Sequence, residues 1–593
     1  MIRPALAPID RLIAEGKLDQ AETQLRRLIA RSPSDVSLVS TMATVLSGMG
    51  RRDESLLFHQ RAAELAPDQP APWLALGLAL VQIHRHADAL APLERAASLA
   101  PAQPAATLAL ARAQVATGRS SAAIAQLESL LHLLPGDPEA TLLLESLLSD
   151  RGQTGAAVSV LREAISRRHG DPILRAALCH RLLCASDATP SQIGAEHESL
   201  GRLLAPDIPG STLLRDRQED RRLKLALISP DLRGRPAAAF IEPIVELMGR
   251  KAFELHVFPL TAHRDATTDR LAKLADVWHP PQAILSTDSR PDLSALAASL
   301  AETKLDIAID LAGYSPNSGL AALAHRIAPV QCTYGYPGTS GIPAVDLRLA
   351  DSLTLPIHDT AIGTERIVRL DPCLFCFRPP ADAPMPQRAW ERRAVVFGCF
   401  ASPARISTRS VELWAALLSK IPSARLVLKS KPYADPVVRE FFTAAFSSRG
   451  VDPARLVLMG HSKDLSTHLS AYNGIDVALD TVPYNGTTTT CEALWMGVPV
   501  VTLRGDHHAS RSGTSLLSAV GKGEWAAETP EAFVDVAASL VSDVEALAAA
   551  RSKLRDQVRR SPLCDERTFV NRFQDALRAA WIRWCRTGSA GRG

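Results

Sequence analysis

The sequence predicts a helical-repeat solenoid followed by two Rossmann-like α/β halves. Three observations carry this prediction. Prolines and glycines recur every 34 residues in the first third of the chain, apolar strands alternate with helical stretches over the remainder, and a turn-rich, charged stretch separates the two regions. At 593 residues the chain is too long for a single hydrophobic core, so several domains are expected.

The repeats show three series in register. Prolines recur at one position of the repeat and glycines at a second position, where His84 replaces the glycine in one repeat. A small residue follows five positions after the glycine position. The three series are Pro33, Pro67, Pro101 and Pro135; Gly16, Gly50, Gly118 and Gly152; and Ala21, Ser55, Ala89, Ala123 and Ala157. Each unit is expected to be two amphipathic helices, with glycine at the turn and proline between units. About five units fit between residues 2 and 171, and the predicted solenoid covers residues 1–190.

After a linker at residues 191–221, two series of apolar strands predict two parallel sheets. The first half, residues 222–385, has strands near 223–229, 253–260, 305–311, 329–335 and 345–351, with helical stretches at 292–302 and 317–326. The second half, residues 386–585, has strands near 394–400, 425–431, 455–460, 476–481 and 499–503. Such alternation is typical of doubly wound sheets whose strand ends face a cleft. The last residues, 586–593, are predicted to be a disordered tail.

Residues 480–503 are the most informative segment for function. They read as a strand end, a loop with four threonines at 487–490, a helix and another strand. A first helical turn has unpaired N–H groups and the positive end of the dipole, so phosphate oxygens fit there. Glu492, about one turn later, is placed to accept ribose hydroxyls. The alternative is a polar helix N-cap, but four successive threonines after Gly486 favour a ligand site.

Composition excludes several classes of protein. The formal net charge of +3, with both signs interspersed, gives no case for nucleic-acid binding, and no window reaches the roughly 18 apolar residues of a membrane helix. The nine cysteines lie mostly in apolar runs and the first residues lack a signal-peptide stretch, which predicts a reducing cytosol, so the protein is expected to be cytoplasmic. Cys373 and Cys376 form a lone C-x-x-C pair, interpreted as buried thiols on a strand and not as a zinc site.

The chain resembles the protein O-glycosyltransferases of the O-GlcNAc transferase and SPINDLY family. The period of the repeats and the order of these positions resemble the tetratricopeptide repeat, and four segments carry the rest of the resemblance: SPDLRGRPAAAFIEP (229–243), APVQCTYGYPGTSGIPAVDLRLADSLTLP (328–356), VVFGCFASPARISTRSVELWA (395–415) and DVALDTVPYNGTTTTCEALWMGVPVVT (476–502). The TTTTCE sequence together with RLVLKSKP (425–432) is more similar to the SPINDLY branch.

The resemblance implies a GT-B fold and an inverting, metal-independent transfer of a sugar from a nucleotide donor. The sugar would be GlcNAc, fucose or a related one, and the acceptor a Ser or Thr hydroxyl of a protein recruited by the repeats. No cofactor or catalytic metal is expected, so protein cations and N–H groups must neutralise the leaving phosphate. The repeats have an alternative role as a spacer or oligomerisation arm.

The family's functional positions fall on nine residues of this sequence. The candidate catalytic residues are Asp231, Arg235 and Arg405, and the candidate donor-binding residues are Lys429, His468, Thr487, Thr488, Thr489 and Glu492. The resemblance assigns the diphosphate to Thr488 and Thr489, the ribose to Glu492 and the nucleobase to His468. Lys429 and Lys431 alternate on a strand and should point the same way, and Lys429 is favoured because it lies nearer the apolar run.

Several positions depart from the family pattern. Arg235 stands where the family usually has histidine, so a proton-accepting role there is lost. Arg405 replaces a lysine but keeps the charge, and Tyr314 stands where SPINDLY relatives often have histidine. One alternative is therefore a flagellin glycosyltransferase that uses a CMP-linked acidic sugar, with Arg235 binding its carboxylate. Another is a non-catalytic repeat adaptor with a degenerate transferase domain.

Overall fold

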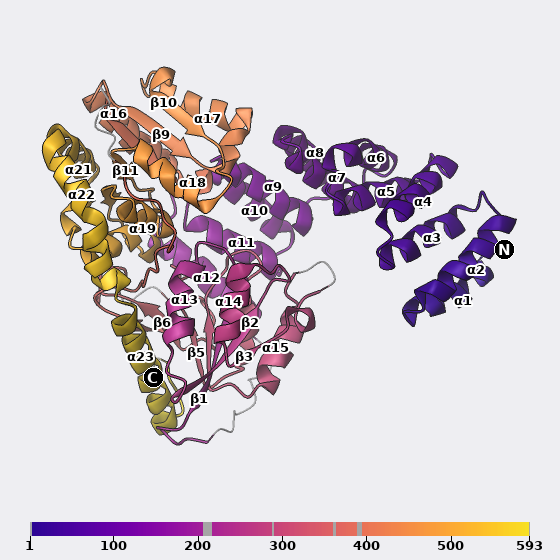
Figure 1. Ribbon diagram of the computed structural model, residues 1–593, viewed down its shortest axis with the longest axis horizontal. Helices are drawn as coiled ribbons and strands as arrows, with labels where there is room; N and C mark the ends of the chain where they lie inside the picture. Colours follow the sequence, from indigo (N-terminus) through magenta and orange to yellow (C-terminus); the bar gives the residue numbers. More distant parts are fainter. Residues whose placement is uncertain (1–2, 206–215, 287–289, 360–362, 388–393, 592–593) are drawn as a thin grey trace. The chain divides into compact units, whose positions relative to one another are not determined.

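The computed structural model describes residues 3–205, 216–286, 290–359, 363–387 and 394–591. The chain forms two compact units, one of residues 1–148 with 163–168 and one of residues 149–162 with 169–593. Figure 1 gives the labels of the helices and strands. Helical repeats followed by two parallel sheets confirm the predicted fold class.

Helices α1 to α10 follow one another in the predicted repeat region. They are α1 (Arg3–Ala14), α2 (Leu18–Arg31), α3 (Val36–Gly48), α4 (Arg52–Leu65), α5 (Pro70–Gln82), α6 (His86–Leu99), α7 (Pro104–Ala116), α8 (Ser120–Leu133), α9 (Pro138–Asp150) and α10 (Thr154–Arg167). The backbone explains the glycine position of the repeat, because the glycines at 16, 50, 118 and 152 all have φ between 72° and 78°. His84 occupies the same left-handed conformation at φ 61°.

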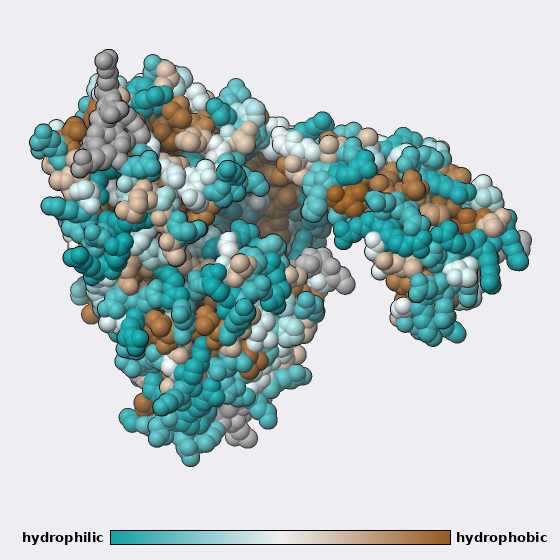
Figure 2. Space-filling model, in the orientation of Figure 1, coloured by the Kyte–Doolittle hydropathy of each residue, from teal (hydrophilic) through white to brown (hydrophobic). Residues whose placement is uncertain are grey.

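The small residues of the third series are buried between helices. Ala21, Ala89, Ala123 and Ala157 are fully buried, and Ser55 donates its hydroxyl to the carbonyl of Ala43 at 2.7 Å. The helices of the repeat region also expose large apolar side chains, including those of Leu57, Leu78 and Leu133. Figure 2 shows such brown areas among the hydrophilic surface of the repeat helices.

A further helix pair, α11 (Pro172–Leu182) and α12 (Pro190–Leu204), belongs to the second unit. Thr189 and Gln192 form a capping box at the start of α12. Gly201 lies so close to the backbone of Gly341 that a Cβ there would be 1.7 Å from the Gly341 carbonyl oxygen. The first residues of the linker predicted at 191 are therefore helical and packed, because Gly201 serves a close approach and not a turn.

The first half has a seven-stranded parallel sheet in the order β3-β2-β1-β4-β5-β6-β7. Its strands are β1 (Leu223–Ser229), β2 (Phe253–Pro259), β3 (Val277–Trp278), β4 (Ile307–Asp310), β5 (Val330–Thr333), β6 (Leu347–Ala350) and β7 (Arg366–Arg369). Its connecting helices are α13 (Ala238–Leu247), α14 (Ala266–Leu274) and α15 (Leu293–Glu302). The predicted helical stretch at 317–326 is instead a 3₁₀ segment, η2 (Leu320–His325).

The second half has a six-stranded parallel sheet in the order β10-β9-β8-β11-β12-β13. Its strands are β8 (Val396–Cys399), β9 (Arg425–Lys429), β10 (Leu456–Met459), β11 (Val477–Leu479), β12 (Val500–Leu503) and β13 (Ala526–Ala527). Its helices are α16 (Thr408–Lys420), α17 (Pro436–Ser447), α18 (Leu465–Ser470), α19 (Thr488–Trp495), α20 (Ser512–Ala519), α21 (Pro530–Ser542) and α22 (Val544–Arg560). The strands β3, β7 and β13 are not predicted by the sequence, because they lie at sheet edges, are short or only half-buried, and lack the apolar run of a central strand.

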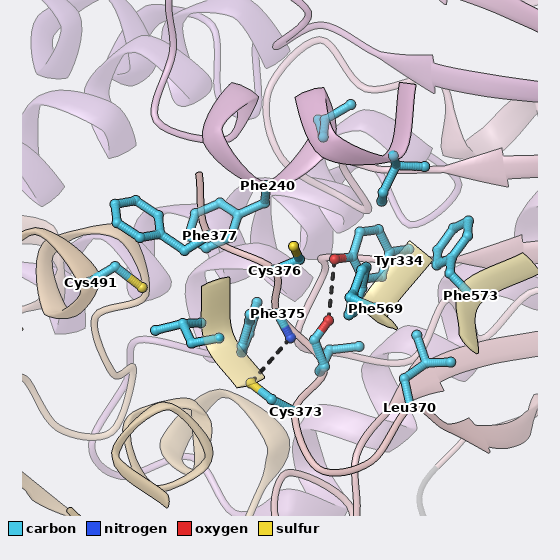
Figure 3. Packing of buried hydrophobic residues seen from close by; sticks show 14 of the residues in the cluster. Phe240, Tyr334, Leu370, Cys373, Phe375, Cys376, Phe377, Cys491, Phe569 and Phe573 are labelled. Carbon is cyan, nitrogen blue, oxygen red and sulfur yellow. Dashed lines mark hydrogen bonds between the residues drawn. The ribbon is translucent and has the colours of Figure 1, made fainter. Parts of the chain in front are cut away.

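The C-terminal helix α23 (Glu566–Thr587) returns to the first half. Figure 3 shows Phe569 and Phe573 beside Tyr334, with the Tyr334 and Phe573 ring centroids 5.5 Å apart. The Trp581 indole N–H donates to the carbonyl of Gln218 at 3.1 Å. The tail predicted from residue 586 begins inside this helix, and the carbonyl of the buried Ala590 accepts a hydrogen bond from Arg366.

Cys373 and Cys376 are buried free thiols on an irregular segment between β7 and β8 (Figure 3), and not on a strand as the sequence predicts. Burial raises the pKa of Cys373 to about 12. Within the described ranges no group of three or more His, Cys, Asp or Glu side chains is arranged to hold a metal ion. None of the helices in those ranges is long and apolar enough to cross a membrane.

Candidate active site

The strand order of each sheet reverses at one point, and a cavity of the second unit is built from the loops at those points. The reversals lie between β1 and β4 and between β8 and β11. Ligands of open parallel sheets bind outside the carboxyl ends of the strands at such positions. The cavity has a volume of about 330 Å³ and is lined from the loops after β1, β4, β5, β8 and β11 and from α11.

Five of the nine predicted site residues line this cavity. Asp231 and Arg235 come from the loop after β1, Arg405 from the loop after β8, and Thr487 and Thr488 from the start of α19. The fold thus brings Asp231 and Thr488, which are 257 positions apart in the sequence, to the same cavity. A positive helix terminus and two guanidinium groups face it, which favours an anionic ligand.

Thr489 lies beside a second, smaller cavity. This space, of about 20 Å³, is lined by Phe400, Tyr472, Asp480 and Thr489, among others. The Tyr472 hydroxyl donates to the carbonyl of Thr489 at 3.2 Å. The threonine run therefore divides, with Thr487 and Thr488 on the main cavity and Thr489 on the smaller one.

Arg405 is held in place by an aromatic ring. It ends the short 3₁₀ turn η3 (Pro403–Arg405) after β8, and its guanidinium carbon lies 4.2 Å from the centre of the Tyr484 ring. Tyr484 also lines the cavity. Stacking on a ring orients the guanidinium while leaving its N–H donors free for an anion.

The loop before α19 is anchored by Asp480, a role that the sequence did not predict. One carboxylate oxygen of this buried group accepts from the backbone N–H of Thr481 at 2.8 Å and of Gly486 at 2.6 Å. The other accepts from the Thr502 hydroxyl at 2.8 Å. Burial raises the pKa of Asp480 to about 6 against these bonds. One side chain thus fixes the loop's start and end to the neighbouring strand.

Three predicted donor-binding residues form one hydrogen-bonded chain. Lys429 Nζ lies 2.8 Å from His468 Nδ1, and His468 Nε2 lies 3.1 Å from a carboxylate oxygen of Glu492. An ammonium can only donate, so Nδ1 accepts and the imidazole hydrogen is on Nε2, donating to Glu492. The Tyr472 hydroxyl lies 3.2 Å from the same oxygen and shares its one hydrogen between this carboxylate and the Thr489 carbonyl. Lys429 is buried, and burial lowers its pKa while Glu492 opposes that shift.

We expect Lys429→Met to weaken nucleotide binding about tenfold, because the loss of one charged hydrogen bond leaves His468 unoriented. Calorimetry with UDP and with GDP measures the change. Lys431→Met is the matched control, since Lys431 follows two residues later and is exposed. Equal weakening by both substitutions would contradict the placement of Lys429 in the donor site.

His180, Tyr336 and His197 are site residues that the sequence did not reveal. His180 lies on α11 and Tyr336 after β5, and both line the cavity. The His197 ring on α12 donates from Nδ1 to the carbonyl of Ile193 at 2.7 Å, so its Nε2 accepts from the Tyr336 hydroxyl at 2.9 Å. The sequence around His180 and His197 reads as ordinary helix, and only the fold shows that α11 lines the cavity with α12 supporting Tyr336 behind it.

Tyr314, a departure from the family pattern, does not line the cavity. Its hydroxyl donates to the carbonyl of Ser340, and its ring lies edge-on to that of Tyr336 at 6.0 Å. The loop that carries it is held by Asp310, which accepts from the N–H groups of Ala312 and Gly313. The other Asp310 carboxylate oxygen is buried and has no hydrogen-bond partner among the described residues.

We expect Asp310→Asn to change how stability depends on pH. Burial raises the pKa of Asp310 to about 7, above the ordinary value of 3.8. The folded state then keeps a proton that the unfolded state releases between about pH 4 and 7, so the wild type loses stability as pH rises through that window. The loss reaches up to about 4 kcal/mol by pH 7, and the asparagine variant lacks it.

Urea denaturation of both proteins at half-unit intervals from pH 4.5 to 8 measures this difference. The stability of Asp310→Asn minus that of the wild type should increase with pH and level off above 7. A constant difference across the series would show that Asp310 is ionised throughout.

Comparisons with known proteins agree with this architecture. The model of glycosyl transferase family 41 matches residues 209–376 and 386–573, and a tetratricopeptide repeat model matches residues 80–147. A Thermobaculum terrenum O-GlcNAc transferase mutant has a similar structure, with a TM-score of 0.77 and 31% identity over 91% of this chain and 99% of that one.

Plant proteins are also similar. The probable UDP-N-acetylglucosamine–peptide N-acetylglucosaminyltransferase SPINDLY of Arabidopsis thaliana is 35% identical over 379 residues, 62% of this chain. The SPINDLY protein of Solanum lycopersicum is 33% identical over 430 residues, 70% of this chain. The matches span 40% and 45% of those plant proteins. The family model covers most of this chain and the bacterial transferase matches nearly end to end, so the chain belongs to glycosyl transferase family 41.

Proposed function

We propose that this protein transfers a sugar from a nucleotide donor to Ser or Thr hydroxyls of a protein acceptor, with inversion and without a metal. The observation that carries the proposal is the single cavity that Arg405, Arg235 and the start of α19 line together. Family membership supports the reaction class, and the bacterial and plant relatives bear names of N-acetylglucosaminyltransferases.

The leaving phosphate is the group that this arrangement suits. Breaking the bond between the sugar and the phosphate leaves negative charge on the phosphate oxygens, and fixed donors aimed at that charge lower the barrier. Arg405 offers a guanidinium fork, Thr487 and Thr488 offer hydroxyls, and the first turn of α19 offers backbone N–H groups. The residues present thus supply the neutralisation that a metal ion supplies in other transferases.

The nucleoside end of the donor fits the chain from Lys429 to Glu492. Glu492 is buried and one of its carboxylate oxygens is used by His468 and Tyr472, so its second oxygen is open to ribose hydroxyls. His468, fixed on both ring nitrogens, presents a rigid face for stacking a base. These contacts support base stacking on His468 and ribose binding by Glu492, the roles that the resemblance implies.

A donor panel tests the proposal. The purified full chain is incubated with UDP-GlcNAc, GDP-fucose or a CMP-linked acidic sugar and a Ser/Thr-containing peptide library, and intact mass and released nucleotide are measured. We expect one donor to be consumed with a matching mass increment on peptide or on the chain itself. Nucleotide binding without consumption of any donor would overturn the transferase proposal in favour of a non-catalytic adaptor.

The same panel decides what Arg235 does. Its side chain lines the cavity, and a guanidinium binds a sugar carboxylate well. Consumption of the CMP-linked acidic sugar alone would assign it that role, and consumption of UDP-GlcNAc or GDP-fucose would exclude it.

A further inference from the structure

Two side chains are the candidates for taking up the acceptor's proton among the described residues that line the cavity. Arginines 235 and 405 offer only hydrogen-bond donors and no acceptor, so they cannot take up the proton. Burial raises the pKa of the lining tyrosines 334, 336 and 484, so their hydroxyls stay neutral. The Asp231 carboxylate and the His180 imidazole remain.

His180 is open to the cavity and unused by the fold. Its Nδ1 is buried without a hydrogen-bond partner, and its Nε2 has none among the described residues, so Nε2 is the nitrogen left facing the space. The ring is nearly parallel to that of Tyr336, with an interplanar angle of 24° and centroids 6.4 Å apart. Because His197 fixes Tyr336, the His180 ring rests on a rigid support.

The charges around His180 link its basicity to the donor. Burial, and then the positive charges of Arg181 and Arg405 and the neighbouring His197, lower its pKa to about 3. Arg181 is on the same helix, His197 is on α12 and Arg405 is on η3, while Asp231 and Arg235 line the same cavity. A phosphate bound at Arg405 would cancel much of this positive field and raise the basicity of the imidazole.

We propose that His180 binds the acceptor hydroxyl through Nε2 and takes its proton during transfer, once donor phosphate has neutralised Arg405. The proposal rests on the proposed transferase function. In this step the acceptor oxygen forms a bond to the anomeric carbon, the bond from that carbon to the phosphate oxygen breaks, and the electron pair leaves with the nucleotide. The hydroxyl proton moves to Nε2, and solvent removes it after product release.

Two variants separate this role from a structural one. His180→Gln keeps a hydrogen-bonding side chain that cannot take a proton, and His263→Gln is the control at an exposed histidine outside the cavity. We expect His180→Gln to lower kcat about 10²-fold or more, with donor affinity within twofold of wild type and the acid limb of the pH profile lost. Asp231→Asn should keep that limb even where it lowers kcat. A His180→Gln enzyme with wild-type kcat would overturn the proposal.

A second measurement does not need turnover. Imidazole carbon resonances of the ¹³C-histidine-labelled protein are titrated with and without pyrophosphate, and the His180 signal is assigned by its loss in His180→Gln. We expect its pKa to rise when pyrophosphate binds. An unchanged His180 pKa at saturating pyrophosphate would contradict the proposed link between His180 and the donor phosphate. If the wild type shows the pKa shift but consumes no donor, only the transferase function is contradicted.

Discussion

Arg405→Ala is expected to lower kcat about 10²- to 10³-fold, because it removes a cation aimed at the leaving phosphate. Arg405 lines the cavity together with Thr487 and Thr488, and it stacks on Tyr484 of the donor loop. Its guanidinium rests on the Tyr484 ring at 4.2 Å, so it meets the leaving phosphate with little reorganisation. The loss should fall on kcat more than on donor affinity, because charge grows on the phosphate as the bond breaks.

Arg405→Lys is the informative control for this prediction. Lysine keeps the charge but loses the planar fork and the stacking on Tyr484, so its kcat should lie between those of wild type and the alanine variant. Donor consumption at saturating donor, followed by released nucleotide, measures all three enzymes. If the alanine variant keeps kcat within threefold of wild type, Arg405 does not stabilise the transition state.

The sequence predicted the elements that bury apolar surface and missed those that depend on long-range contacts. The strand β1 lies where LKLALIS predicts it, because both faces of a central strand are covered and six of its seven residues are buried. The 34-residue spacing of the repeats was also predictable from the sequence, since His84 and the glycines mark the same turn with one backbone conformation. Edge strands such as β7 carry no such signal, as RIVR is half-buried throughout.

The sequence predicted the part of the site whose ligand-binding groups lie together in one segment. Residues 487–492 carry their own signal of a phosphate loop, because hydroxyls and a helix start lie together directly after a glycine. His180 carried none, since its helix meets the cavity only after residues more than 150 positions apart, 180 and 336, come together. The same is true of Asp480, whose partners include a hydroxyl 22 residues away.

Asn485 and Gly486 add to the hold that Asp480 has on the donor loop. The loop is crossed by hydrogen bonds from Asn485, which donates to the carbonyl of Thr481 at 2.9 Å and accepts from the N–H of Gly513 at 3.3 Å. Gly486 leaves no room for a side chain, because a Cβ there would lie 2.5 Å from the Thr489 hydroxyl oxygen. The first turn of α19 is thus preorganised for phosphate, which reduces the entropy lost on binding.

We therefore expect Asp480→Ala to have the largest effect on stability. Removing the carboxylate leaves two backbone N–H groups and the Thr502 hydroxyl buried without their acceptor, and each orphaned donor costs about 1–3 kcal/mol. Urea denaturation should show a loss of at least about 3 kcal/mol on that basis. Calorimetry should show loss of UDP and GDP binding.

Asp480→Asn separates loop geometry from charge. The amide oxygen can still accept from Thr481 and Gly486, while the Thr502 hydroxyl can turn to accept from the new NH₂ group. We expect this variant to fold, to keep most of the nucleotide affinity and to be at least as stable as wild type at pH 7, because the ionised carboxylate is disfavoured by burial. An asparagine variant as unstable as the alanine variant would mean that the negative charge, and not the pair of acceptor oxygens, holds the donor loop on the end of β11.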